Sequence, residues 1–166
     1  MPDKDSISQH IAWRLFLMSH SILTKKVTAA LEAAGCISFD TYDVLVTLSE
    51  APEHSMKMGD LADATFFSNS GISRRVARLE ERGLIRRVRC EDDGRVFYAT
   101  LTASGRKALR KAWPVYREVI EENFVRTMSK NDARAMTETL RTVLRGIDTG
   151  LLQRWVEEDR TEAPMC

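Results

Sequence analysis

Apolar residues recur at spacings of three, four and five along residues 6–34, a stretch with neither proline nor glycine. This period predicts one long amphipathic helix, which Gly35 ends. Trp13, Phe16 and Leu17 lie off its main apolar stripe. A helix that is apolar on more than one side touches more than one partner. We therefore expect this helix to contact more than a single neighbour.

Three shorter helices follow. The first covers residues 38–50, with Ser38 or Asp40 as its N-cap. After a loop over residues 51–55, a short helix runs from about residue 57 to residue 65, and Ser68 caps the next one. On a helical wheel this last helix turns Ile72, Val76, Leu79 and Gly83 to one side. Its other side carries Ser70, Ser73, Arg74, Ala77, Arg78 and Glu81. Two short helices joined by a tight turn predict a helix-turn-helix.

The helix with the basic face is followed by a pattern typical of a β-hairpin. Residues 84–90 and 96–101 have strand character, and residues 91–95 form an acidic turn in which Gly94 supplies conformational freedom. Arg95 then stands at the tip, where Asp93 can orient its guanidinium. On a protruding hairpin an arginine suits the narrow minor groove of DNA, whereas composition alone favours a solvated loop charge. Both readings stay open at this point.

Two long helices complete the chain. One begins near Thr102 and runs to about Thr127, and Pro114 should kink or interrupt it. The other begins after Ser129 or Asn131 and carries an apolar seam over some twenty residues, while residues 157–166 form a frayed end. The long helices at the two ends of the sequence leave apolar surface uncovered when packed on each other. We therefore expect an obligate two-fold dimer rather than an intramolecular bundle.

Charge is unevenly divided although the net charge is only +1. Residues 56–106 carry ten basic and seven acidic side chains, and nine of the ten basic residues are arginine. Arginine suits bidentate recognition of phosphate and guanine. No run of 18 apolar residues and no signal peptide is present, which predicts a cytoplasmic protein without membrane contact. Cys36, Cys90 and Cys166 are an odd, widely spaced set and indicate a reducing compartment.

Together these patterns predict a mainly α fold with a small β wing. A winged helix-turn-helix DNA-binding domain covers residues 38–102, and residues 6–34 and 103–157 form a helical dimerisation region. The run from Ser70 to Arg87, the Asp93-Gly94-Arg95 turn and the stretch from Leu101 to Gly105 closely resemble the multiple-antibiotic-resistance regulator (MarR) family. The resemblance covers roughly residues 7–150.

The resemblance implies a homodimeric regulator, usually a repressor, that binds double-stranded DNA at a pseudo-palindromic operator. It places the fourth helix in the major groove and the wing arginine in the minor groove. The matching positions are Ser70, Ser73, Arg74, Arg78, Asp93 and Arg95. Gly94 replaces an arginine found in many relatives, which weakens the expected grip of the wing.

Family members commonly release DNA when a small aromatic or phenolic anion binds between the dimer helices and the reading domain, and an aromatic cluster with one histidine suits an aromatic acid. The candidates to line such a pocket here are Trp13, Leu17, His20, Tyr42 and Trp113. Taken singly, each of them can instead be an ordinary residue of the hydrophobic core. No cofactor is expected. The histidines show no ligand spacing with the cysteines, so no metal site is predicted.

Other function classes receive less support. The chain contains no nucleophile elbow, no phosphate-binding glycine loop and no paired Cys/His set, so we do not expect an enzyme. A winged-helix protein-interaction module is one alternative, and a redox-sensing regulator based on Cys36 or Cys90 is another. The sequence names neither the operator, the regulated genes nor the effector, and it does not separate a repressor from an activator.

Overall fold

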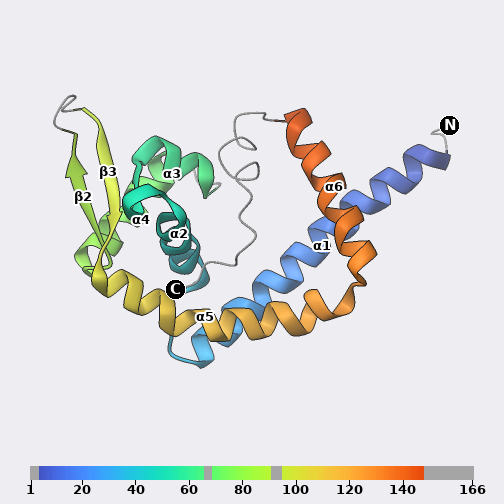
Figure 1. Ribbon diagram of the computed structural model, residues 1–166, viewed down its shortest axis with the longest axis horizontal. Helices are drawn as coiled ribbons and strands as arrows, with labels where there is room; N and C mark the ends of the chain where they lie inside the picture. Colours follow the sequence, from blue (N-terminus) through green and yellow to red (C-terminus); the bar gives the residue numbers. More distant parts are fainter. Residues whose placement is uncertain (1–3, 66–68, 91–94, 148–166) are drawn as a thin grey trace.

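The computed structural model describes residues 4–65, 69–90 and 95–147. The helices and strands lie in two regions (Figure 1). One region holds the short helices and the sheet, and the other holds the long helices. The elements in chain order are α1 (Lys4–Ala33), α2 (Phe39–Glu50), η1 (Pro52–His54), β1 (Ser55–Lys57), α3 (Met58–Ala64), α4 (Asn69–Glu81), β2 (Ile85–Arg89), β3 (Phe97–Leu101), α5 (Ala103–Asn123), η2 (Val125–Thr127) and α6 (Lys130–Ile147). The predicted fold class is confirmed.

Helix α1 ends where the sequence predicts. Gly35 adopts φ +57°, and the N–H groups of Gly35 and Cys36 donate to the carbonyl oxygens of Glu32 and Leu31, at 3.0 and 2.9 Å. A residue in this left-handed conformation closes a helix because it redirects the chain while satisfying the last carbonyls. Lys111 of α5 donates from Nζ to the carbonyl oxygen of Gly35 at 2.9 Å, which ties the end of α1 to α5.

The sheet has three antiparallel strands in the order β1-β3-β2. Residues 51–55 were expected to be a loop that leads into a helix at residue 57, and this prediction is wrong for Ser55–Lys57. These three residues form β1, in which Ser55 pairs with Thr100 and Lys57 pairs with Tyr98. Three residues are too few to show an alternating pattern, so only the distant partner strand β3 makes this segment a strand.

Helix α5 departs from expectation at two points. It continues through Pro114 as one helix, so the proline causes no break, and it ends at Asn123 instead of near Thr127. Residues Val125–Thr127 form a separate 3₁₀ turn. Ser129, two residues after this turn, caps α6 as predicted: its Oγ accepts from the N–H of Asp132 at 3.2 Å, and the Asp132 carboxylate accepts from the N–H of Ser129.

The core fills the region of short helices. It joins α2, α3, α4 and the sheet to the C-terminal half of α1 and the first half of α5. Its largest fully buried side chains are Leu31, Leu45, Leu48, Leu61, Ile72, Leu79, Ile85 and Leu109. None of the described residues of α6 is buried. The core therefore joins the short helices to one another and stops before the N-terminal half of α1.

Candidate nucleic-acid interface

Helix α4 divides into a buried and an exposed side as the wheel predicts. Ile72 and Val76 are buried in the core, while Ser73, Arg74 and Arg78 are exposed. We call these three exposed residues the reading face. Ser70 lies in the first turn of α4, where the structure describes the backbone alone. Residues 66–68 lie outside the described part, so the predicted Ser68 cap is not seen.

Arg75, which the sequence analysis left unassigned, does not share the reading face. Its Nη1 donates to Oδ2 of Asp40 on α2 at 2.7 Å, and its side chain is 29% exposed. Among three neighbouring residues of α4, Arg74 therefore points outward, Arg75 reaches across to α2, and Val76 enters the core. Helical periodicity places Arg75 at a boundary between the two sides, which is why the wheel alone did not predict its partner.

A second ionic contact joins α4 to the wing. Glu80 accepts from the backbone N–H of Arg87 at 2.9 Å and from Nε of the same residue at 2.6 Å. The backbone N–H of Arg87 and then its guanidinium hold the pKa of Glu80 below its ordinary value. Arg87 therefore forms a contact within the protein, although in the sequence it is one of several arginines of this region. The contact holds the C-terminal turn of α4 against the first half of β2.

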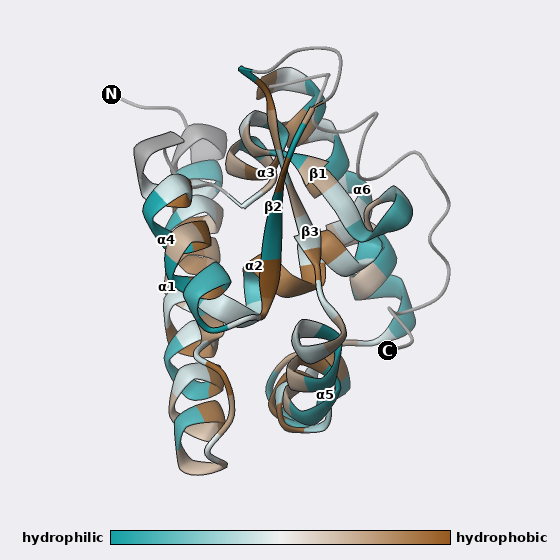
Figure 2. Cartoon of the chain, turned by 90° about the vertical axis from the view of Figure 1, so that its left-hand side faces the viewer, coloured by the Kyte–Doolittle hydropathy of each residue, from teal (hydrophilic) through white to brown (hydrophobic). Residues whose placement is uncertain are grey.

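The wing is the hairpin of β2 and β3, with Arg86 opposite Thr100 and Arg89 opposite Phe97. After Ile85 every residue of β2 is exposed, and Figure 2 shows this strand as largely hydrophilic. Arg95, at the start of the returning chain, is exposed as expected. Asp93 and the rest of residues 91–94 lie outside the described part, so its predicted contact with Arg95 is not seen.

Further exposed arginines, which the sequence pattern does not select, lie in the turn after α4 and on strand β2 of the wing. They are Arg82, Arg86 and Arg89. Because Arg86 and Arg89 lie on opposite faces of one strand, a period-two pattern does not select them as a group. Only the exposure of both faces of β2 identifies them. Basic side chains spread over adjoining elements suit the phosphate backbone of a nucleic acid.

The base of the wing is fixed by the start of α5. Thr102 is the N-cap of α5, and its Oγ1 accepts from the N–H of Gly105 at 3.0 Å. The same hydroxyl lies 2.7 Å from the carbonyl oxygen of Gly83 and 2.9 Å from that of Leu84. One threonine thus joins α5 to the turn between α4 and β2.

The five candidate pocket residues lie in two places. Tyr42 is 3% exposed, and its ring stacks on that of Tyr116 with 4.5 Å between the ring centroids. The ring of Trp113 also stacks on Tyr116, with 5.9 Å between the centroids. This stack connects α2 with α5. Trp13 stacks instead on Phe16 at 6.0 Å, and Trp13, Leu17 and His20 are exposed on the N-terminal half of α1. Within one chain the five side chains do not share a lining.

Acidic side chains of α2 border the aromatic stack. Burial, and then the charge of Asp40, raise the pKa of Asp43 from 3.8 to about 6, although Arg75 lowers it. Burial, followed by the charges of Asp43 and Glu50, raises the pKa of Tyr116. The potential at the stack is therefore negative when these carboxyls are ionised.

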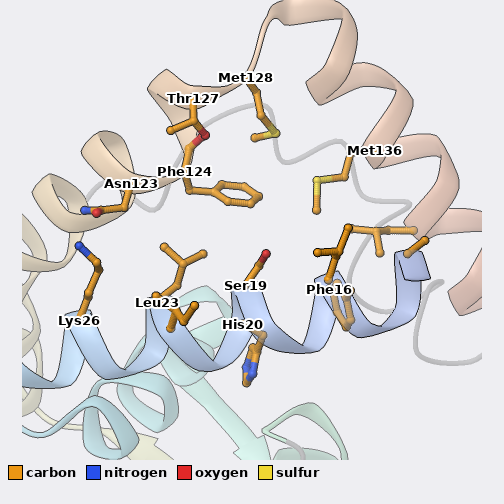
Figure 3. Close-up of a pocket in the computed structure, with 14 residues that line it drawn as sticks. Phe16, Ser19, His20, Leu23, Lys26, Asn123, Phe124, Thr127, Met128 and Met136 are labelled. Carbon is orange, nitrogen blue, oxygen red and sulfur yellow. The ribbon is translucent and has the colours of Figure 1, made fainter. Parts of the chain in front are cut away.

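An apolar groove of about 700 Å³ separates α1 from the end of α5, η2 and α6. We call it the α1–α6 groove. Figure 3 shows Ser19 and Leu23 of α1 facing Phe124, Met128 and Met136 across it. Lys26 and Asn123 approach each other at one end, and His20 points away. Beyond the groove, α1 exposes further large apolar side chains, among them Trp13 at 57% and Met18 at 55%.

Other kinds of site find no support in the described part of the chain. No group of three His, Cys, Asp or Glu side chains there is arranged to hold a metal ion. Cys36 and Cys90 are both free and half-buried. Of the helices described, none combines the length and apolar character that crossing a membrane requires.

Comparison with known proteins agrees with this geometry. A family model described as MarR family matches residues 31–96. The MarR family transcriptional regulator AbsC of Streptomyces coelicolor is 29% identical with a TM-score of 0.78, over 89% of this chain and 97% of that chain. None of the curated proteins matches the chain by sequence.

Two similar structures contain DNA. Sco3205, a MarR family transcriptional regulator of Streptomyces coelicolor solved in complex with DNA, is 26% identical with a TM-score of 0.79, over 89% of this chain and 92% of that chain. The S. aureus MepR–DNA complex is 24% identical with a TM-score of 0.70, over 80% of this chain and 96% of that chain, which shows a shared fold. The family resemblance inferred from the sequence is confirmed.

Proposed function

We propose that this chain, a MarR-family winged-helix transcription regulator by its matched sequence and its fold, acts as a homodimeric repressor on a pseudo-palindromic operator in the cytoplasm. The observation that supports DNA reading most directly is the reading face, exposed on a helix whose opposite side is held in the core. The similar regulator Sco3205 was solved in complex with DNA.

The reading face has the chemistry that a major groove requires. Ser73 is small, so the helix can approach base edges closely, and its hydroxyl donates or accepts. Arg74 and Arg78 present planar guanidinium groups, which bind guanine or phosphate in bidentate fashion. The N-terminal end of a helix also favours phosphate, because the backbone dipole is positive there. In this arrangement α4 reads bases and the surrounding arginines bind the backbone.

The wing supplies a second point of attachment. Arg95 follows the turn of the hairpin, where it can enter the minor groove beside the bases that α4 reads. Because the negative potential is enhanced where that groove is narrow, a single guanidinium there adds both affinity and preference for DNA shape. The Glu80–Arg87 contact supports this role by fixing the wing relative to α4.

Pairing with a second copy explains the uncovered apolar surface. The α1–α6 groove and the exposed apolar residues of α1 together form a larger apolar surface than a monomer normally exposes to water. A two-fold axis through these helices would bury them and repeat the reading face. The two α4 helices then need to lie about 34 Å apart, one turn of duplex DNA.

A small aromatic or phenolic effector would release the operator by changing that spacing. The Tyr42–Tyr116–Trp113 stack supports this idea because it lies between α2 of the reading region and α5, which continues into the long helices. Asp43 and Glu50 make the potential there negative. A neutral phenol is therefore favoured over an aromatic anion at the stack.

Selection of bound duplexes from a random DNA pool tests the proposal. The expected product is an inverted repeat whose half-sites are one helical turn apart. A variant with Arg74→Ala and Arg78→Ala serves as the control and should enrich no motif. Enrichment of no sequence by the wild-type chain, even at low salt, would contradict DNA reading and favour a protein-interaction module.

A further inference from the structure

The position of α4 depends on two kinds of contact, apolar packing and polar bonds, and of the polar bonds the one between Glu80 and Arg87 joins its C-terminal turn to the wing. Ile72, Val76 and Leu79 bury the inner side of α4 in the core. Apolar contact is not directional, so it holds the helix down without setting its rotation sharply. The bond from Arg75 to Asp40 is different, because a charge-assisted hydrogen bond at 2.7 Å has a defined direction.

Arg75 is well placed to act on the reading face. It is the neighbour of Arg74 in sequence, and it points toward α2 while Arg74 points to solvent. Rotation of α4 about its axis would move both side chains together. Holding Arg75 at Asp40 therefore fixes the direction in which Arg74 leaves the helix.

We propose that Arg75 is a positioning residue, whose bond to Asp40 sets the rotation of α4 and thereby the direction in which the reading face meets DNA. The inference rests on the proposed operator binding. The pair is only partly buried, with Asp40 56% exposed, so it adds little to folding stability. Its loss changes the accuracy of DNA reading more than it changes the fold.

Asp43 reports whether the contact exists in solution. It faces Asp40 and Glu50 on its own helix, Arg75 from α4 and Tyr116 from α5, and the charge of Arg75 lowers its pKa. Replacing Arg75 with glutamine should therefore raise the pKa of the Asp43 carboxyl above about 6 in an NMR titration. An unchanged titration would mean that Arg75 does not lie over α2.

The test compares Arg75→Gln, Asp40→Asn and the double variant on the selected operator and on random DNA, by fluorescence anisotropy at several salt concentrations. The two single changes alter net charge in opposite directions. If Arg75 acted by bulk charge, Arg75→Gln would weaken binding and Asp40→Asn would tighten it. A positioning role predicts that both weaken operator binding, by roughly fivefold, and that the double variant loses no more than either single variant.

The salt dependence separates positioning from phosphate contact. Arg75→Gln should leave the slope of log affinity against log salt unchanged, whereas loss of a phosphate contact lowers it by about one. Arg117→Gln on α5, which removes the same charge elsewhere, should change neither affinity nor slope. Far-ultraviolet circular dichroism confirms folding of each variant.

The binding experiments on the Arg75 and Asp40 variants have outcomes that contradict the positioning role. A lower slope for Arg75→Gln, or tighter binding by Asp40→Asn, overturns the positioning role. If the wild-type chain binds its operator and both single variants bind it with the same affinity, the positioning role is also overturned, while the proposed function stands. If the wild-type chain selects no operator, the proposed function fails and the inference fails with it.

Discussion

Gly105 is the residue at which α5 comes closest to the turn between α4 and β2. A Cβ at this position would lie 2.1 Å from the carbonyl oxygen of Leu84 and 2.6 Å from a methyl group of Leu101. The Leu84 carbonyl also accepts from the N–H of Thr102 at 3.1 Å, so it has little freedom to move. This close approach explains why a glycine stands three residues after the threonine cap.

Gly105→Ala should therefore destabilise the protein, although alanine normally favours a helix over glycine. We expect a loss of about 1–3 kcal/mol in the free energy of unfolding, measured by urea titration. Ser104→Ala, at an exposed position in the same turn, is the matched control and should stay close to wild type. Equal stability of the two variants would show that α5 can shift away from Leu84 at no cost.

Arg95 carries the prediction for the wing. Arg95→Ala should weaken operator binding about tenfold and lower the salt slope by about one, because a single cation near the phosphates is lost. Mobility-shift titrations at several salt concentrations measure both quantities. Lys107→Ala, an exposed cation on α5, provides the comparison. An unchanged affinity and slope for Arg95→Ala would remove the wing from the mechanism.

At the scale of elements, the polar contacts between helices carry information that periodicity does not. The sequence predicted α4 and separated its buried side from its exposed side correctly, because a period of 3.6 residues is a local property. It did not predict that Arg75 binds α2 or that Arg87 binds Glu80, because each pair joins two different elements and depends on how those elements pack. The same limit applies to β1, which only β3 makes a strand.

The burial of Asp43 on α2 leads to a prediction about pH. The folded-state pKa of Asp43 is raised from 3.8 to about 6, so its ionised form opposes folding. The stability that the protonated carboxyl of Asp43 contributes is fully present below about pH 4 and is lost as the pH rises through about 6. Asp43→Asn should thus be more stable than wild type at pH 7.5, by roughly 1–3 kcal/mol, and equal to it near pH 4.

Urea unfolding of both chains at a series of pH values measures this difference. Asp63→Asn on α3, at an exposed position, controls for loss of a carboxylate. A stability gain of the same size at pH 4 and pH 7.5 would show that the effect does not come from ionisation of Asp43.

For the whole molecule, the uncovered surface of the long helices predicts association. Leu15 lines the α1–α6 groove and is 56% exposed in the single chain. A change to glutamate at such a position is harmless in a monomer, whereas in a dimer it buries a charge in an apolar interface. Leu15→Glu should reduce the mass measured by light scattering from two 18.9 kDa chains toward one.

Lys107→Glu reverses a charge on the exposed surface of α5 and should leave the mass unchanged. The melting temperature of the wild-type protein should also rise with protein concentration, because association stabilises the folded state by mass action. A wild-type mass of one chain together with a concentration-independent melting temperature would contradict the proposed dimer.

The amino-acid sequence was enough to predict most helices, the β-hairpin, the buried side of α4 and the family resemblance, because hydrophobic period, capping residues and glycines act over a few neighbouring positions. The packing of the elements was needed to show that Arg75 binds Asp40 of α2 and that Arg87 binds Glu80, while Arg74 lies on the exposed side of α4. It also decided that the five aromatic-pocket candidates lie in two places. The physical reason is that these ion pairs and a shared lining require residues of different elements to meet, and the packing of the elements determines which of them do.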